Sequence, residues 1–191
     1  KDFSWSTTLT WSMDRNRIDE LSNGRTEDVN NKWFVGEEIG VYYDWVYDGI
    51  WKTEEAEEAA KYGRKPGQIK VKDLNNDGKI DANDDKKIVG HTRPRWTGGW
   101  SNTFSYKNFD LSLAFQGTLG NDIWNGTKSF GMASAQNALK EAYTNAWRKE
   151  GDNASYPRIS TVDENKNYGN GSSWFVENGS YLRLQNAQLG Y

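Results

Sequence analysis

An acidic stretch between residues 73 and 84 carries the residues whose types and spacing most clearly indicate chemistry. It reads Asp73-Leu74-Asn75-Asn76-Asp77-Gly78-Lys79-Ile80-Asp81-Ala82-Asn83-Asp84. Oxygen-bearing side chains stand at loop positions 1, 3, 5, 9 and 12, and a glycine stands at position 6 for the sharp turn, which is the spacing of calcium loops. The stretch therefore predicts a calcium site.

The expected calcium ligands are side-chain oxygens and one backbone carbonyl, because calcium prefers hard oxygen ligands. They are Asp73, Asn75, Asp77, the carbonyl of Lys79, and Asp84, with Asp81 acting through a water. An Asp at the last position, as in dockerin-like loops, closes the site less firmly than a bidentate Glu. The alternative is a turn rich in Asp and Asn whose side chains bind their own backbone. A bound ion would be structural, because no nucleophile or base stands nearby in the sequence.

Two other candidate sites depend on weaker patterns. Asp44 and Asp48 bracket aromatic residues in the segment 42–48, which could hold a sugar by stacking and hydrogen bonding. The alternative is an aromatic strand that packs on a neighbour. His91 is the single histidine and the chain has no cysteine, which excludes thiol catalysis and a multi-histidine metal site within this chain. We therefore expect no enzyme activity.

Composition narrows the class of protein further. The chain has 191 residues, a formal net charge of -3 and 14% aromatic residues, and its mean hydropathy is -0.95. No apolar run approaches the roughly 18 residues of a membrane-spanning helix, so a helical membrane protein is excluded. No stretch is strongly basic, which argues against nucleic acid as a partner.

Four segments alternate between apolar and polar residues, which predicts strands over about 3–13, 96–106, 109–119 and 174–191. The dipeptide Lys107-Asn108 joins the second and third strands as a tight hairpin. The last segment changes phase between Leu184 and Ala187, which predicts a bulge. Long segments, about 14–95 and 120–173, separate the strands, and short helices are expected in them over 53–61 and 135–147.

The two faces of the predicted strands differ in an informative way. One face is aromatic and aliphatic, and the other carries small uncharged Ser, Thr, Gly and Gln, which suits a barrel with a lipid face and a lumen face. The residues expected to face lipid are Trp5, Leu9, Trp11, Trp100, Phe104, Leu111, Leu113 and Phe115. Those expected to face the lumen are Ser6, Thr8, Ser101, Thr103, Ser112 and Gln116. A secreted β-sandwich with an aromatic core fits the same alternation.

Blocks along most of the chain resemble one family. They include Tyr47-Asp48-Gly49-Ile50-Trp51, the acidic stretch above with Ile88-Val89-Gly90, Phe115-Gln116-Gly117, Trp174-Phe175-Val176-Glu177-Asn178-Gly179-Ser180-Tyr181-Leu182-Arg183-Leu184-Gln185-Asn186 and Leu189-Gly190-Tyr191. Further blocks lie at 35–40, 66–70, 97–99, 102–111 and 120–122. Taken together and in this order, they resemble the SusC/RagA family of TonB-dependent outer-membrane transporters.

The resemblance implies an all-β fold, an antiparallel transmembrane β-barrel segment that is part of a larger barrel of about 22 strands. Residues 1–191 would be a partial C-terminal barrel domain without the N-terminal plug, and 14–95 and 120–173 would be extracellular loops carrying short helices. The location implied is the outer membrane of Bacteroidetes-type bacteria.

The resemblance also implies partners. They are the remainder of the barrel and the plug, TonB through the missing N-terminal part, outer-membrane lipid, a SusD-like surface lipoprotein, and a glycan or peptide cargo. We therefore expect a fragment of a TonB-dependent nutrient importer. The alternative is a soluble, secreted, calcium-stabilised glycan-binding β-module.

Overall fold

The computed structural model describes residues 2–131, 138–160 and 171–191. The chain divides into two compact units. The sheet unit comprises Lys1–Val41, His91–Ile123 and Asn178–Tyr191, and the insert unit comprises Tyr42–Gly90 and Trp124–Glu177. No helix in the described ranges is long and apolar enough to cross a membrane.

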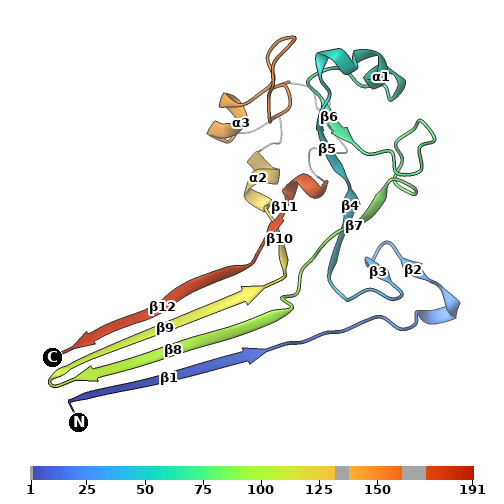
Figure 1. The fold of residues 1–191 in the computed structure, drawn as a ribbon. Helices are drawn as coiled ribbons and strands as arrows, with labels where there is room; N and C mark the ends of the chain where they lie inside the picture. Colours follow the sequence, from blue (N-terminus) through green and yellow to red (C-terminus); the bar gives the residue numbers. More distant parts are fainter. Residues whose placement is uncertain (1, 132–137, 161–170) are drawn as a thin grey trace. The chain divides into compact units, whose positions relative to one another are not determined.

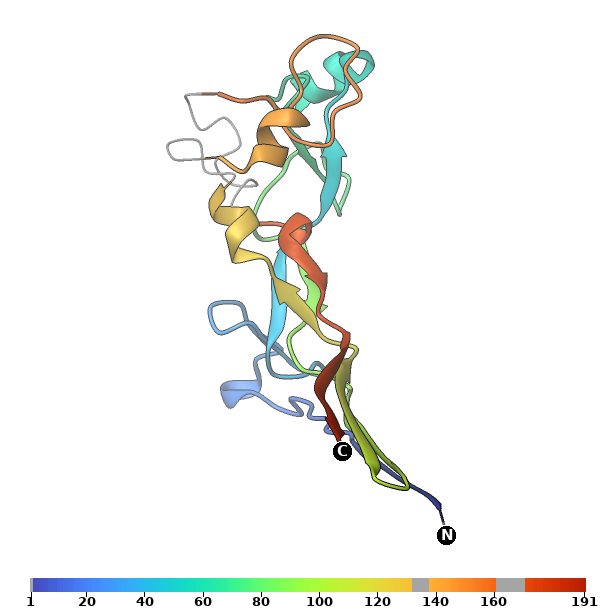
Figure 2. The same ribbon diagram turned by 90° about the vertical axis from the view of Figure 1, so that its left-hand side faces the viewer.

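The sheet unit is built on a four-stranded antiparallel sheet with the order β1-β8-β9-β12. Its strands are β1 (Phe3–Ser12), β8 (Trp96–Tyr106), β9 (Phe109–Leu119) and β12 (Tyr181–Gly190). Figures 1 and 2 together show that these long strands form a single layer. A short hairpin of β2 (Glu27–Asp28) and β3 (Trp33–Phe34) follows β1 along the chain, after the 3-10 turn η1 (Ser22–Gly24).

The hairpin between β8 and β9 has the bounds expected from the alternation. Tyr106 pairs with Phe109, and Lys107 between them adopts a φ of 53°, in the left-handed region that such tight turns need. Phe3 also pairs with Tyr106, so β1 begins at the hairpin end of the sheet, as predicted. The long segment between β1 and β8 therefore leaves and re-enters the sheet at its other end.

The expected single strand over 174–191 is wrong, because this part of the chain forms three separate elements. It forms a 3-10 turn, η3 (Ser173–Phe175), then β11 (Val176–Asn178) and finally β12. The side chain of Asn178 accepts a hydrogen bond from the Ser180 backbone N–H at 2.8 Å, and this local turn ends β11 before β12 begins. The predicted bulge in β12 is confirmed, since the register shifts between Leu184 and Asn186.

Cross-strand register places the aromatic residues of the sheet on one face. Trp5 stacks on Phe104 with ring centroids 6.0 Å apart. Two polar residues interrupt this face, and each accepts a hydrogen bond from an indole: Trp5 Nε1 donates to Asn102 at 3.2 Å, and Trp100 Nε1 donates to Thr7 at 2.9 Å. Thr7 and Asn102 are paired opposite each other. Both indole N–H groups thus have partners without help from water.

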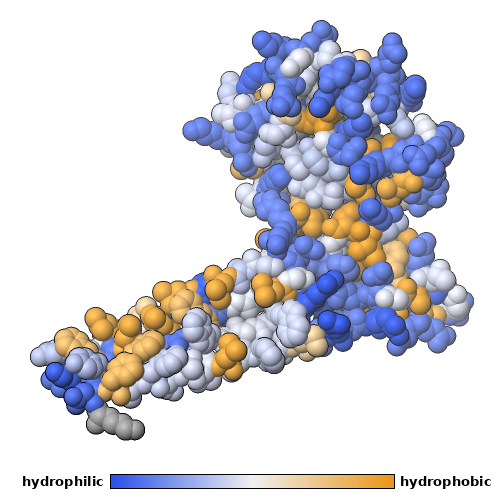
Figure 3. Space-filling view, in the orientation of Figure 1, coloured by the Kyte–Doolittle hydropathy of each residue, from blue (hydrophilic) through white to orange (hydrophobic). Residues whose placement is uncertain are grey.

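Much of the apolar face is uncovered within this chain. Every residue of β1 is exposed, and the exposed fraction reaches 77% for both Trp11 and Leu182. Apolar side chains gather along the sheet on the face that Figure 3 shows. An apolar surface of this kind needs lipid or protein to cover it.

The insert unit contains short paired strands and short helices. β5 (Tyr47–Ile50) pairs with β6 (Ile69–Val71), and β4 (Val41–Trp45) pairs with β7 (Lys86–His91). β10 (Asp122–Trp124) pairs with β11. The helices are α1 (Ala56–Lys61), α2 (Gly126–Gly131) and α3 (Lys140–Thr144), with the 3-10 turn η2 (Thr53–Glu55) preceding α1. A core of Trp45, Ile69 and Val71 anchors β4 to β6.

One of the two expected helices is confirmed and the other is largely wrong. The segment 53–61 forms η2 and α1, and Glu55 accepts a hydrogen bond from the Lys52 backbone N–H at 2.9 Å. In the described part of the second segment, 138–147, α3 is helical and the residues on either side of it are not, and residues 135–137 lie outside the described residues. Ala146 forms a parallel bridge with Tyr156 instead. Trp147 N–H donates to the Tyr156 carbonyl at 2.9 Å and Tyr156 N–H donates to the Asn145 carbonyl at 3.2 Å, in place of the bonds that a continued helix would make.

The register of β1 on β8 can be tested with a disulfide. Ser6 lies opposite Thr103, and directly opposed residues have Cα atoms about 4.5–5.5 Å apart, within disulfide reach. We expect Ser6→Cys/Thr103→Cys to crosslink under mild oxidation, detected by a gel shift that reductant reverses. The matched pair Ser6→Cys/Ser101→Cys is displaced by one diagonal step and should crosslink poorly. Equal crosslinking of both pairs would contradict this register.

Candidate functional site

The acidic loop joins β6 to β7 and is organised around Asp73. One oxygen of its carboxylate accepts hydrogen bonds from the Gly78 backbone N–H at 2.8 Å and from the Tyr62 hydroxyl at 3.1 Å. The other accepts from the Asp77 backbone N–H at 3.3 Å. Desolvation acts to raise the pKa of Asp73, but these hydrogen bonds outweigh it and lower the pKa. Asp73 is therefore an ionised acceptor at neutral pH.

Three of the other predicted ligands also bind the loop's own backbone. Asn75 accepts from Asp77 N–H at 3.1 Å, and Asp77 accepts from Lys79 N–H at 2.8 Å. Asp81 accepts from the N–H groups of residues 83 and 84, whereas the side chain of Asp84 is exposed. Within the described ranges no group of three or more acidic, histidine or cysteine side chains could hold a metal ion. These contacts are those of the Asx-turn alternative, and the calcium site stays a prediction.

Asp85, which the loop spacing did not single out, closes the loop. The residue is 1% exposed. One oxygen accepts from Leu74 N–H at 2.7 Å and the other from Asp81 N–H at 2.8 Å. A single buried side chain thus joins the beginning of the loop to its end. The calcium-loop spacing points to Asp84 at position 12. The role of Asp85 in closing the loop is evident only from its burial and its hydrogen bonds.

The sequence left two interpretations of the aromatic segment 42–48, sugar binding and packing on a neighbouring strand. Trp45 is buried in the core, and Asp44 lies 3.1 Å from the Lys86 ammonium group, so this part packs as an aromatic strand. Asp48 lies 3.6 Å from Lys72. The single histidine, His91, has its Nδ1 2.6 Å from a carboxylate oxygen of Glu38.

Tyr47 and Asp48 line a cavity of about 590 Å³ in the insert unit. Tyr47 stacks on Trp174 with centroids 5.0 Å apart and an interplanar angle of 12°. Burial, with a smaller contribution from the neighbouring Tyr156, raises the pKa of Tyr47 to about 12. The cavity is also lined by Trp51, Trp147 and Asp152. The pattern of segment 42–48 pointed to Tyr47 and Asp48 as candidate site residues, whereas no sequence pattern pointed to Trp147 or Asp152.

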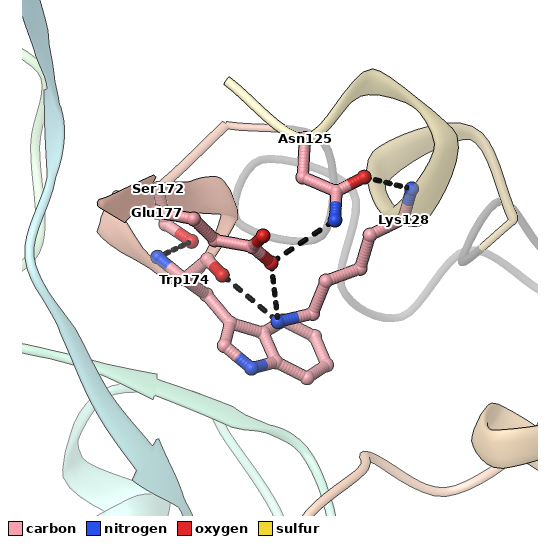
Figure 4. Close-up of polar contacts among 5 residues, drawn as sticks. All are labelled: Asn125, Lys128, Ser172, Trp174 and Glu177. Carbon is pink, nitrogen blue, oxygen red and sulfur yellow. Dashed lines mark hydrogen bonds and ion pairs between the residues drawn. The ribbon is translucent and has the colours of Figure 1, made fainter. Parts of the chain in front are cut away.

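A polar cluster holds Trp174 in place (Figure 4). The Lys128 ammonium group lies 4.8 Å from the Trp174 ring centroid and donates to the Trp174 carbonyl at 3.0 Å. Asn125 bridges the cluster: its side chain donates to Glu177 at 3.0 Å and accepts from Lys128 N–H at 2.8 Å. Ser172 accepts from Trp174 N–H at 3.3 Å. These contacts fix the ring that forms one wall of the cavity.

Comparison with known proteins relates the chain to one group of receptors. No family model matches it. It is 30% identical over 205 residues to TonB-dependent receptor P3 of Formosa agariphila and 32% identical over 203 residues to TonB-dependent receptor P26 of the same organism. TonB-dependent receptor SusC of Bacteroides thetaiotaomicron is 25% identical. Each alignment covers 100% of this chain, which spans only about 20% of the length of these relatives.

Solved structures agree on the fold. A chain of the RagAB peptide importer in its open-open state matches with a TM-score of 0.75 and 21% identity, over 99% of this chain and 20% of that one. The RagAB peptide transporter matches with a TM-score of 0.71 and 22% identity, over 99% and 21%. The fold is therefore an antiparallel segment of a larger barrel, open in this chain. The resemblance to SusC/RagA-type TonB-dependent receptors is confirmed over the whole chain.

The closing role of Asp85 predicts a local change in stability. Asp85→Ala leaves two backbone N–H groups without their acceptor, at a cost of about 1–3 kcal/mol each when buried. We expect trypsin to cleave the intact receptor after the exposed Lys79 at least about tenfold faster, because local opening becomes easier. Asp84→Ala is the matched control: with all variants assayed in EDTA, so that no calcium is bound, its cleavage rate should equal that of the wild type. Equal rates for both variants would contradict the role of Asp85.

Proposed function

We propose that the chain is part of an outer-membrane importer of nutrients. The whole-length match to TonB-dependent receptors is the observation that carries this proposal. The two-faced sheet supports it, because an apolar face opposite a face of small polar residues is typical of membrane barrels. A soluble module is not favoured, since the sheet leaves large apolar side chains such as Trp11 and Leu189 uncovered.

In this proposal the aromatic face of the sheet meets lipid and the polar face lines the lumen. The apolar face contains Trp5, Leu9, Trp100, Leu111 and Leu113. The strand register pairs Leu9 with Trp100, and it pairs both Trp5 and Leu111 with Phe104. Polar groups that face hydrocarbon need partners inside the protein. The hydrogen bonds from Trp5 to Asn102 and from Trp100 to Thr7 meet that requirement.

The proposed partners follow from the relatives. A structure with the same fold belongs to RagAB, described as a peptide importer, and a curated relative is the receptor SusC. We infer that the parent protein works with a SusD-like surface lipoprotein, takes a glycan or peptide as cargo, and couples to TonB through a part that precedes this segment. The insert unit would then lie on the outer surface of the membrane.

One experiment tests both the location and the activity. In the parent organism, deletion of the gene should abolish uptake of its cargo, and the receptor should occur in the outer-membrane fraction with heat-modifiable gel migration. Leu113→Arg should reduce the folded band and uptake, because Arg on the lipid face costs about 2–4 kcal/mol near the midplane. Ser112→Arg, on the opposite face, is the matched control and should assemble normally. Equal sensitivity of both positions, or recovery in the soluble fraction, would contradict the proposal.

We further propose that the acidic loop binds calcium when the ion is present. The loop sequence supports this, and the carboxylates of Asp73 and Asp77 accept hydrogen bonds from three consecutive backbone N–H groups of one turn, those of residues 77, 78 and 79. Calcium would replace some of these weak N–H contacts with stronger ion–oxygen contacts. Sites of extracellular modules fill at about 0.1–1 mM calcium, so weak binding is sufficient outside the cell. The ion would stiffen the turn between β6 and β7.

Terbium luminescence offers a direct test of the calcium proposal. Tyr62 donates a hydrogen bond to Asp73 and is near enough to sensitise a bound terbium ion. We expect a signal that calcium displaces with a Kd of about 1 mM and that Asp73→Ala weakens at least tenfold. Asp48→Ala, outside the loop, should not change it. If the intact receptor shows no displaceable signal, the loop is an Asx-rich turn only.

A further inference from the structure

We infer that the outer end of the sheet, opposite the β8–β9 hairpin, binds one membrane lipid whose headgroup carries an anionic phosphate. Arg15 and Arg95 bind the phosphate, and an acyl chain lies in a hollow of the apolar face over Gly98 and Gly117. The inference rests on the proposed function, because it takes this end of the sheet to lie at the outer surface of the membrane. It goes beyond that function, since ordinary contact with lipid requires no particular headgroup.

A row of paired residues across the sheet forms the hollow. In strand order the row consists of Trp11, Gly98, Gly117 and Leu182. Trp11 and Leu182 are each 77% exposed, whereas the two positions between them have no side chain. A Cβ at either glycine would lie 2.7 Å from a backbone carbonyl oxygen of the neighbouring edge strand, so a larger residue does not fit without a shift of the backbone. The row is therefore a low floor between two large apolar side chains.

Aromatic rings border this floor on both sides along the strands. Toward the outer end, the ring centroids of Trp11 and Trp96 lie 6.2 Å apart. Toward the hairpin, Trp100 stacks on Phe115 with centroids 5.6 Å apart, and its indole N–H donates to Thr7 at 2.9 Å. Each pair of rings joins two strands, so the rings are held in place before a ligand binds and lose little entropy on binding. Such a hollow fits a flexible apolar chain, which covers the exposed rings.

The depth of the hollow in the membrane agrees with a lipid that crosses the boundary of the hydrocarbon layer. The 11 residues of β8 make ten steps from Tyr106 to Trp96. At about 3.3 Å per step and a tilt of about 35–45°, these steps cover about 25 Å, the height of the apolar band of an outer-membrane barrel. Arg95 follows directly outside this band and stands three residues from Gly98, about 7–8 Å along the membrane normal. The headgroup layer of one leaflet has a similar thickness, about 5–8 Å.

Arg15 and Arg95 lie on neighbouring segments at this boundary. Arg95 directly precedes β8, and its backbone N–H donates to the Leu119 carbonyl at 2.9 Å, which fixes its backbone against β9. Beyond the end of β1, Asp14 lies 3.6 Å from Arg93, so the segment after β1 stays beside the segment before β8. Arg15 follows Asp14 and is exposed. Both guanidinium groups therefore belong to the same end of the sheet.

Arg15 and Arg95 also lack acidic partners. Nearby, Arg17 lies 2.8 Å from Asp19 and forms an ion pair with it. No acidic side chain pairs with Arg15 or Arg95 in the part of the chain that the structure describes. A guanidinium group binds phosphate oxygens through two parallel N–H bonds. A free phosphate would leave the apolar hollow uncovered, and a lipid without charge would not use the arginines, so the two features together favour a phosphorylated lipid.

The test uses the purified full-length receptor in detergent, with native mass spectrometry to count bound lipids. The probe is diphosphoryl lipid A, compared with dioleoylphosphatidylcholine, whose phosphate is balanced by the choline of the same headgroup. We expect lipid A to bind more tightly, and Arg15→Gln/Arg95→Gln to weaken its binding at least tenfold, because each basic side chain near a membrane surface contributes about fivefold. Lys61→Gln/Lys149→Gln removes two exposed cations from the insert unit. It is the matched control and should bind lipid A like the wild type.

A second variant tests the hollow without changing the charge. Trp11→Ala should weaken lipid A binding about fivefold, the gain from covering about 40 Å² of apolar surface. The substituted side chains are exposed, so each variant should fold, and heat-modifiable gel migration checks this. An excess of inorganic phosphate should not displace the lipid.

Four results would overturn the inference. They are equal affinity for lipid A and phosphatidylcholine, wild-type affinity in folded Arg15→Gln/Arg95→Gln, wild-type affinity in folded Trp11→Ala, and displacement of lipid A by inorganic phosphate. Lipid binding by a receptor that takes up no cargo would contradict the importer proposal and leave the lipid site intact. Uptake by a receptor whose lipid binding does not depend on the two arginines would do the reverse.

Discussion

The register of the β8–β9 hairpin is the constraint on which the rest of the sheet depends. In a strand the side chains alternate between faces, so a slip of one residue would exchange the two faces completely. The tight turn at Lys107 and the pairing of Tyr106 with Phe109 prevent such a slip. β1 pairs with β8 and β12 pairs with β9, so that the apolar side chains of all four strands lie on the same face. The bulge at Leu184 restores that phase in β12, where the sequence alternation breaks.

Tryptophan residues occupy two different environments in this protein. On the sheet, tryptophans such as Trp5 and Trp11 are exposed and suit contact with lipid, and the indole N–H of Trp5 is satisfied by a neighbouring strand. In the insert unit, Trp45 and Trp51 are buried against aliphatic and cationic side chains. Composition alone therefore says little about an aromatic residue here. Its neighbours across the sheet or across a loop decide its role.

Long-range contacts organise the insert unit because its strands are too short to do so. β5 and β6 contain only 4 and 3 residues. Single side chains take over the task of holding segments together: Asp85 closes the acidic loop, and Lys128 joins α2 to the turn before β11. Trp147 is seated on Gly67 in a similar way. The cavity is a product of these contacts.

The sequence alone determined the strands of the sheet, their faces, the hairpin and the bulge, because alternation and turn residues are local signals. It also determined the family resemblance and located the acidic loop. It failed for the helix expected over 135–147 and for the break at Asn178, where tertiary pairing and a side-chain turn override the local pattern. The role of Asp85 and the cavity beside Trp147 were decided only by tertiary structure. Burial and contact between residues as distant as Gly67 and Trp147 arise when the chain folds, and no local spacing records them.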